Sequence, residues 1–212
     1  MPRVNKPTNK ELLQHIHEYS LNLNSRELYI HSHSVSEEES GLDFHVAVKT
    51  IKNLQLLDHI SNEPIVIHLS SIGGNWNDGM AIYDAIKLTR SPVTIIGYGI
   101  VASMGTIIMQ AGDIRSLTPN VEFMVHYGSF SIDTNSISAK SAIDWNEKLN
   151  KKMLNIYCDR CKRGDFFKDK TDSYIIKYMD KKLRNQQEWY MDSEEAVKYG
   201  FIDNVWGTRG YE

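Results

Sequence analysis

A serine lies where a buried strand is expected to give way to a helix. The apolar run 92–96 predicts a strand, 97–99 predicts a glycine-bearing turn, and a helix of small and apolar residues starts near Ser103 and stops at Gly112. Free backbone N–H groups and the positive dipole end at a helix N-terminus can stabilise an oxyanion beside an activated hydroxyl. Ser103 is therefore a candidate nucleophile, although serine at such a position more often serves only as a helix cap.

A second junction of the same kind precedes it. The apolar run 64–69 predicts a strand, which leads through Gly73 and Gly74 into a predicted helix over 76–90. If the two strands are parallel, both junctions lie at the carboxyl edge of the sheet, where binding sites form. The backbone N–H groups of Gly73 and Met104 can then converge on one carbonyl oxygen. The alternative is a plain tight turn with close helix packing.

A general base for Ser103 must come from one of eight histidines, and only His126 follows the serine in the chain. It ends the predicted strand 121–126, so it reaches the same carboxyl edge if that strand is parallel. His68 is the rival, but its place in the run 65–69 also suits a buried structural histidine. The order Ser…Asp…His of α/β-hydrolases would need Asp113 as the acid and leaves no room for the usual strands, so we prefer Ser…His…acid.

Four blocks of the sequence resemble the Clp protease proteolytic subunit family, in the family's order, over roughly residues 26–206. They read SSIGGNWNDGMAIYDAI, GYGIVASMGTIIMQAG, PNVEFMVHYG and EWYMDSEEAVKYGFIDNV. The resemblance implies that Ser103 is the nucleophile and His126 the general base of a serine peptidase. It also implies that the backbone amides of Gly73 and Met104 form the oxyanion hole.

The third member of the triad is where the chain departs from the family. The position of the family's aspartate falls on Glu188, which can also accept the imidazole N–H. Asp192 is a possible substitute and Asp180 a more remote one. Other departures are Ile72 for the family's proline and 127–128 for its Gln-Pro pair. The chain is thus identified as a divergent member, with a phage-encoded protein as one option.

The alternation of strands and helices predicts an α/β fold with parallel pairing. The resemblance specifies a ClpP/crotonase-like spiral of ββα units with a protruding long helix over about 138–161. We expect 1–25 to be an N-terminal segment near a ring axis, flexible in part, and 26–212 to be the peptidase domain. The remaining predicted helices are 11–23, 44–60, 173–183 and 193–199, and the first predicted strand is 28–30.

The resemblance also implies partners. Chains of this family form seven-membered rings, usually stacked in pairs, in which the long helix makes the contact between rings. Trp145 and Ile156 suit that contact, or they pack on their own sheet. An ATP-dependent unfoldase of the Clp type is the expected partner and unfolded polypeptides the expected substrates. The chemistry needs no metal or organic cofactor.

The composition sets limits on other functions. The 212 residues include 41% hydrophobic and 24% charged residues with a formal net charge of -3, which gives no broad attraction to nucleic acid or to anionic membranes. No apolar run is long enough to span a bilayer, and the polar N-terminus lacks a signal peptide, so we expect a cytoplasmic protein. Cys158 and Cys161 predict two reduced thiols on a helix rather than a redox pair or half a metal site.

Two rival functions remain open. A crotonase-like enzyme acting on acyl thioesters shares the fold and the two-amide oxyanion hole, but it would not need both Ser103 and His126. A non-catalytic ring subunit would keep the fold without the chemistry, and Glu188 in place of aspartate is the feature that favours it.

Overall fold

Eight strands form one mixed sheet in the part of the chain that the structure, a computed structural model, describes: residues 8–32 and 41–207. The strands are β1 (Leu21–Asn22), β2 (Glu27–Ser32), β3 (Ile65–Ser71), β4 (Val93–Ala102), β5 (Ile114–Leu117), β6 (Glu122–His126), β7 (Glu188–Met191) and β8 (Asn204–Val205). The helices are α1 (Asn9–Tyr19), α2 (Phe44–Ile60), α3 (Trp76–Leu88), α4 (Met104–Met109), α5 (Ser136–Cys161), α6 (Asp172–Gln186) and α7 (Ser193–Tyr199), with a 3₁₀ turn over Asp165–Phe167.

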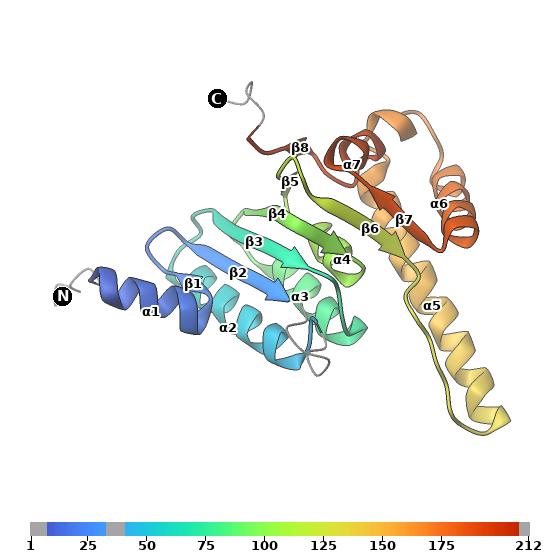
Figure 1. Cartoon of the computed structure of the whole chain (residues 1–212), viewed down its shortest axis with the longest axis horizontal. Coiled ribbons are helices and arrows are strands. Elements are labelled where there is room, and N and C mark those ends of the chain that lie inside the picture. Colours follow the sequence, from blue (N-terminus) through green and yellow to red (C-terminus); the bar gives the residue numbers. More distant parts are fainter. Residues whose placement is uncertain (1–7, 33–40, 208–212) are drawn as a thin grey trace.

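The predicted α/β class with parallel pairing is confirmed. Strands β2, β3 and β4 are parallel neighbours, and β4 is also parallel to β5 and β6 (Figure 1). Only the outer pairs β1–β2 and β6–β7 are antiparallel. The division at residue 25 stays a prediction, but β1 pairs with β2, so the sheet begins on its N-terminal side. Residues 1–7 of that predicted segment lie outside the described residues.

Strand β4 is longer than the run 92–96 predicted, because it continues through the two glycines. Its first half pairs with β5 over Thr94–Gly97, and its second half pairs with β6 over Ile100–Ala102. Gly99 adopts a φ of 61°, which glycine tolerates without steric cost, and the register with β3 shifts nearby. The strand therefore changes its pairing partner midway, and its C-terminal end lies beside the end of β6.

One face of the sheet is covered by helices and carries the core. Along β3, Ile65, Ile67 and Leu69 are buried while the residues between them are half-buried, so the strand is covered fully on one face only. Helices α2, α3 and α4 lie on the buried face (Figure 1). Helix α2 buries Ala47, Thr50, Leu54 and Leu57, whereas Ile60 at its end is exposed.

Helix α5 projects beyond the sheet, as the sequence predicted (Figure 1). Its second half is anchored in the core by Met153, Leu154, Tyr157, Cys158 and Cys161. Its first half leaves Ile137 81% and Trp145 60% exposed, while Ile156 packs against the core. The two cysteines are unpaired buried thiols, and burial raises the pKa of Cys158 to about 11.

Strands β1, β5, β7 and β8 escaped prediction because each is very short. Strand β1 follows α1, so the helix predicted over 11–23 ends earlier, at Tyr19, and β5 carries a charge inside the core. Arg115 of β5 is 2% exposed and pairs with Asp203. Its guanidinium also donates to Gln110 Oε1 and to the carbonyl oxygens of Gly200 and Phe201. This buried cation ties the C-terminal segment to the sheet.

We expect Asp203→Ala to destabilise the protein by about 3 kcal/mol, because it leaves the Arg115 guanidinium buried without its counter-ion. Asp159→Ala is the control, since the Asp159–Lys162 pair is exposed and such pairs contribute about 0–1 kcal/mol. Urea unfolding at one protein concentration measures both. Equal losses for the two variants would contradict the role given to Arg115.

Candidate active site

Ser103 occupies a strained turn between β4 and α4. Its φ is 52° and its ψ is -123°, a region that non-glycine residues rarely adopt. Its backbone N–H donates to Met124 O at 2.8 Å, which holds the turn against β6. The side chain makes no capping bond to the helix, so the alternative that Ser103 is only an N-cap does not hold. The hydroxyl is left available for another partner.

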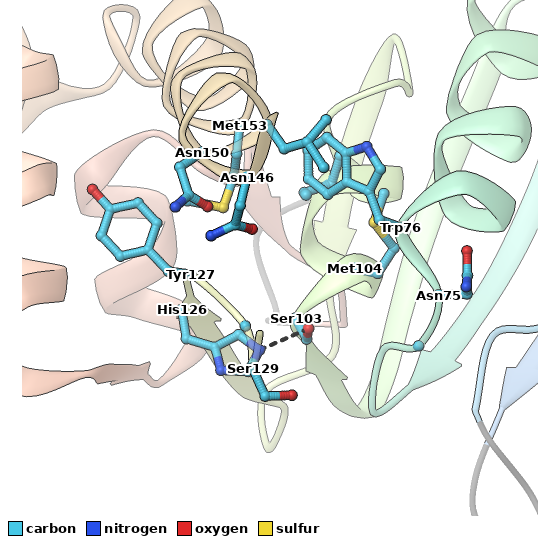
Figure 2. A pocket seen from close by; sticks show the side chains of 14 residues that line it. Asn75, Trp76, Ser103, Met104, His126, Tyr127, Ser129, Asn146, Asn150 and Met153 are labelled. Carbon is cyan, nitrogen blue, oxygen red and sulfur yellow. Dashed lines mark hydrogen bonds between the residues drawn. The ribbon is translucent and has the colours of Figure 1, made fainter. Parts of the chain in front are cut away.

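That partner is His126, the last residue of β6. The distance from His126 Nε2 to Ser103 Oγ is 2.8 Å, a hydrogen bond that Figure 2 shows as a dashed line. The two residues meet because Ala102 pairs with Met124 in the parallel register of β4 and β6. The two residues predicted to work together are thus brought together. His68 stacks on Tyr29 and bonds Tyr98 Oη at 3.0 Å, and it does not line the cavity that holds Ser103.

The environment of His126 favours its neutral form. Burial lowers the pKa of the imidazole below its usual value, and the nearby charge of Glu188 partly opposes this effect. A neutral imidazole with Nε2 facing a hydroxyl is the form that can accept the hydroxyl proton near neutral pH.

Glu188 lies directly opposite His126 in the antiparallel register of β6 and β7. Its carboxylate is exposed and accepts a hydrogen bond from Tyr190 Oη at 3.1 Å. Among the described residues, His126 and Glu188 share no hydrogen bond between their side chains. The structure therefore places the predicted third residue next to the imidazole and couples them through charge.

The two substitutes for Glu188 have other partners. Asp192 is the N-cap of α7 and accepts from Glu195 N at 2.8 Å in a capping box. Asp180 accepts from Tyr127 Oη and from Arg184 Nε, the latter at 2.9 Å. Both carboxylates are thus committed to structural bonds.

The glycine turn after β3 packs directly against the serine. A Cβ placed on Gly73 would lie 2.5 Å from Ser103 Cβ, so only glycine fits there. The Gly73 N–H, however, donates to the buried Ser71 Oγ at 3.0 Å. This bond occupies the amide and corrects the prediction that it faces the site. Gly74, one residue on, lines the cavity together with Met104, the first residue of α4.

The cavity beside Ser103 has a volume of about 500 Å³ and is lined by three helices, the glycine turn after β3 and the segment after β6. Its walls come from α3, α4, α5 and the segment after β6 (Figure 2). The sequence analysis did not find the contributions of Trp76, Asn146, Asn150 and Met153. The α5 residues recur at helical spacing, which was visible in the sequence, but the direction in which that stripe faces was not.

The residue after His126 ties the site to α6. Tyr127 lines the cavity, and its hydroxyl donates to Asp180. Burial, reinforced by this bond, raises the pKa of Tyr127 well above its usual value, so the phenol stays a proton donor. The end of β6 is thereby fixed from both sides, by Ser103 and by α6.

A serine on a strained turn, a histidine at hydrogen-bond distance and a forked parallel sheet define an α/β protein with a hydrolase-like site. The sequence profile of the Clp protease family matches residues 23–209, and the chain belongs to this family. The ClpP-like fold that the sequence analysis expected is therefore confirmed.

Individual relatives agree with this assignment. The ATP-dependent Clp protease proteolytic subunit of Deinococcus radiodurans is 31% identical over 167 residues, 76% of this chain and 74% of the relative. The subunit of the same name from Streptococcus mutans is 32% identical over 165 residues, 76% of this chain and 78% of the relative. Among solved structures, a mutant of ClpP1 from Listeria monocytogenes aligns with a TM-score of 0.66 at 26% identity, covering 88% of this chain and 94% of that one.

Other site classes find little support in the described part of the chain. Over residues 8–32 and 41–207, His, Cys, Asp and Glu side chains form no group of three that could hold a metal ion. In the same ranges, no helix is both long enough and apolar enough to cross a bilayer.

We expect Glu188→Gln to lower the pKa of His126 further, because the substitution removes the negative charge that stabilises the imidazolium. NMR titration of histidine labelled at Cε1 measures the midpoint, which should move to lower pH. Asp192→Asn is the control: it should leave the midpoint unchanged and have little effect on stability, because asparagine caps a helix about as well as aspartate does. A shifted midpoint in Asp192→Asn with none in Glu188→Gln would reverse the assignment.

Proposed function

We propose that the chain is a serine-type endopeptidase of the Clp type, with Ser103 as nucleophile and His126 as general base. The observation that carries this proposal is the 2.8 Å contact between Ser103 Oγ and His126 Nε2 inside an open cavity. Membership of the Clp protease family supports it.

The reaction is acyl transfer through a covalent intermediate. His126 takes the hydroxyl proton as Ser103 Oγ attacks the peptide carbonyl, and it returns that proton to the leaving amine when the C–N bond breaks. A water molecule, deprotonated by His126, then attacks the ester. The acid product leaves, and Ser103 regains its proton.

Two backbone amides stabilise the oxyanion in this proposal. Met104 N–H belongs to the first turn of α4, where the helix leaves backbone donors unpaired. Gly74 takes the place that we first gave to Gly73, because it lines the cavity and the Gly73 amide is occupied. Loss of one such donor costs on the order of 100- to 1000-fold in turnover.

Glu188 acts on His126 as the third member, through its charge and its place opposite the imidazole. It needs only a side-chain rotation away from Tyr190 to approach the ring, since its carboxylate is exposed. No cofactor enters any of these steps.

The proposal includes assembly and partners. In this proposal the chain assembles into seven-membered rings, singly or stacked, that receive unfolded polypeptides from a Clp-type unfoldase. Relatives are called proteolytic subunits of an ATP-dependent Clp protease, which supports assembly with other subunits and an ATP-dependent partner. The exposed apolar side chains on the projecting half of α5 suit the contact between rings. The cytoplasmic location stays a prediction.

Ser103→Ala should abolish both fluorophosphonate labelling and hydrolysis of a short fluorogenic peptide, with a loss on the order of a millionfold in turnover. Ser129→Ala is the matched control, because Ser129 lines the same cavity (Figure 2) but is not the partner of His126. An unlabelled wild type would favour a crotonase-like enzyme. Assembled rings without hydrolysis above the Ser103→Ala background would favour a non-catalytic subunit.

Trp145→Glu combined with Ile143→Glu should weaken assembly between rings, because each change places a charge on exposed apolar surface of α5. Sedimentation velocity measures the shift toward smaller species. Leu88→Glu, on an exposed apolar residue of α3, is the control. Identical sedimentation of all three proteins would argue against α5 as the contact.

A further inference from the structure

One face of α5 forms a wall of the cavity beside Ser103. Asn146, Leu149, Asn150 and Met153 line the cavity and follow one another at the spacing of adjacent helical turns. Figure 2 shows the two asparagine side chains on the side of the cavity opposite Trp76. Both asparagines are half-buried. The α5 wall of the cavity therefore contains two amides within an otherwise apolar stripe.

Most other polar groups of the cavity already have partners. Asn75 Oδ1 accepts from the backbone of Asn77 and Asp78 as the N-cap of α3. Tyr127 Oη donates to Asp180. Among the described residues, the side-chain amides of Asn146 and Asn150 have no hydrogen-bond partner. In the same described part of the chain, Ser129 and the Trp76 indole N–H also have no such partner, but a carboxamide alone among these groups offers both an N–H₂ donor and a carbonyl acceptor.

The cavity lining is also uncharged. It contains no Asp, Glu, Lys or Arg side chain among the described residues, and burial lowers the pKa of its one histidine. Trp76, Met104 and Ile107 form an apolar wall. Such a site disfavours a charged side chain, which would lose its hydration without gaining a counter-ion.

We propose that Asn146 and Asn150 select the substrate residue whose carbonyl Ser103 attacks, and that they favour glutamine. This inference rests on the peptidase function proposed above. The side chain of that residue is attached to the Cα atom next to the attacked carbonyl carbon, so it enters the cavity beside Ser103 in this proposal. A glutamine places its methylenes against Trp76 and Met104.

The end of a glutamine side chain matches the two amides. A carboxamide donates and accepts hydrogen bonds, and so does each asparagine amide. Methionine has nearly the same length but would cover the asparagine amides without pairing them, which carries a desolvation penalty. Glutamate has the same shape but brings a charge into the uncharged cavity. Comparing glutamine, methionine and glutamate at this substrate position therefore distinguishes the effects of side-chain length, hydrogen bonding and charge on cleavage.

The test uses four fluorogenic peptides that differ only at that residue, which is Gln, Met, Glu or Lys. For the wild type we expect kcat/KM for the Gln peptide to exceed that for the Met peptide on the order of tenfold, and the Glu and Lys peptides to be poorer still. Asn146→Leu and Asn150→Leu should each lower kcat/KM for the Gln peptide and raise kcat/KM for the Met peptide. Asn155→Leu is the matched control, since Asn155 is an exposed residue of the same helix outside the cavity.

A small fluorophosphonate carries no peptide side chain, so its reaction with Ser103 tests the peptidase proposal independently of the proposed glutamine preference. A wild type that is labelled at Ser103 but cleaves the Met peptide as fast as the Gln peptide would overturn the glutamine preference and leave the peptidase intact. An unchanged preference in both leucine variants would overturn the role of the asparagines. A wild type that is neither labelled nor active on any of the four peptides would overturn both proposals.

Discussion

The change of partner along β4 is the constraint on which the site depends. The first half of the strand pairs with β5 and the second half with β6, so the sheet forks at Gly97 and Gly99. A Cβ on Gly97 would lie 2.5 Å from Leu117 Cδ2, which shows how closely the branches pack there. Because β6 takes over at the fork, its last residue lies beside the end of β4. Ser103 and His126 meet for this reason.

The turn that carries Ser103 is held by its surroundings rather than by its own preference. A positive φ at a non-glycine residue costs on the order of 1–2 kcal/mol, and the bond from Ser103 N–H to Met124 O helps to offset it. Gly73 packs against the serine Cβ, and Gly79 gives the same kind of room to the Met104 side chain. The glycine turn after β3 and the Ser103–Met104 turn thus lie on backbone that is tightly packed together.

Charge and position, more than a completed hydrogen-bond chain, define the surroundings of His126. Glu188 faces it across the β6–β7 pair, while Tyr127 anchors the end of β6 to Asp180 and Arg184 of α6. Helix α5 has two functions in this arrangement. Its buried half closes the core, and the same helix presents Asn146 and Asn150 to the cavity that holds Ser103.

Sequence alone determined the α/β class, the helix over about 138–161 and the pairing of Ser103 with His126, because strand–glycine–helix junctions and a single downstream histidine are local signals. It could not decide which amide of the Gly73–Gly74 turn is free, since that depends on the bond from Gly73 N–H to Ser71 Oγ. It also missed β5, whose buried Arg115 pairs with Gln110 nearby but has its other partners 85 or more residues away. Only the tertiary structure decided these features, because packing between distant segments sets the hydrogen-bond partners of a residue and the direction in which each side of a helix points.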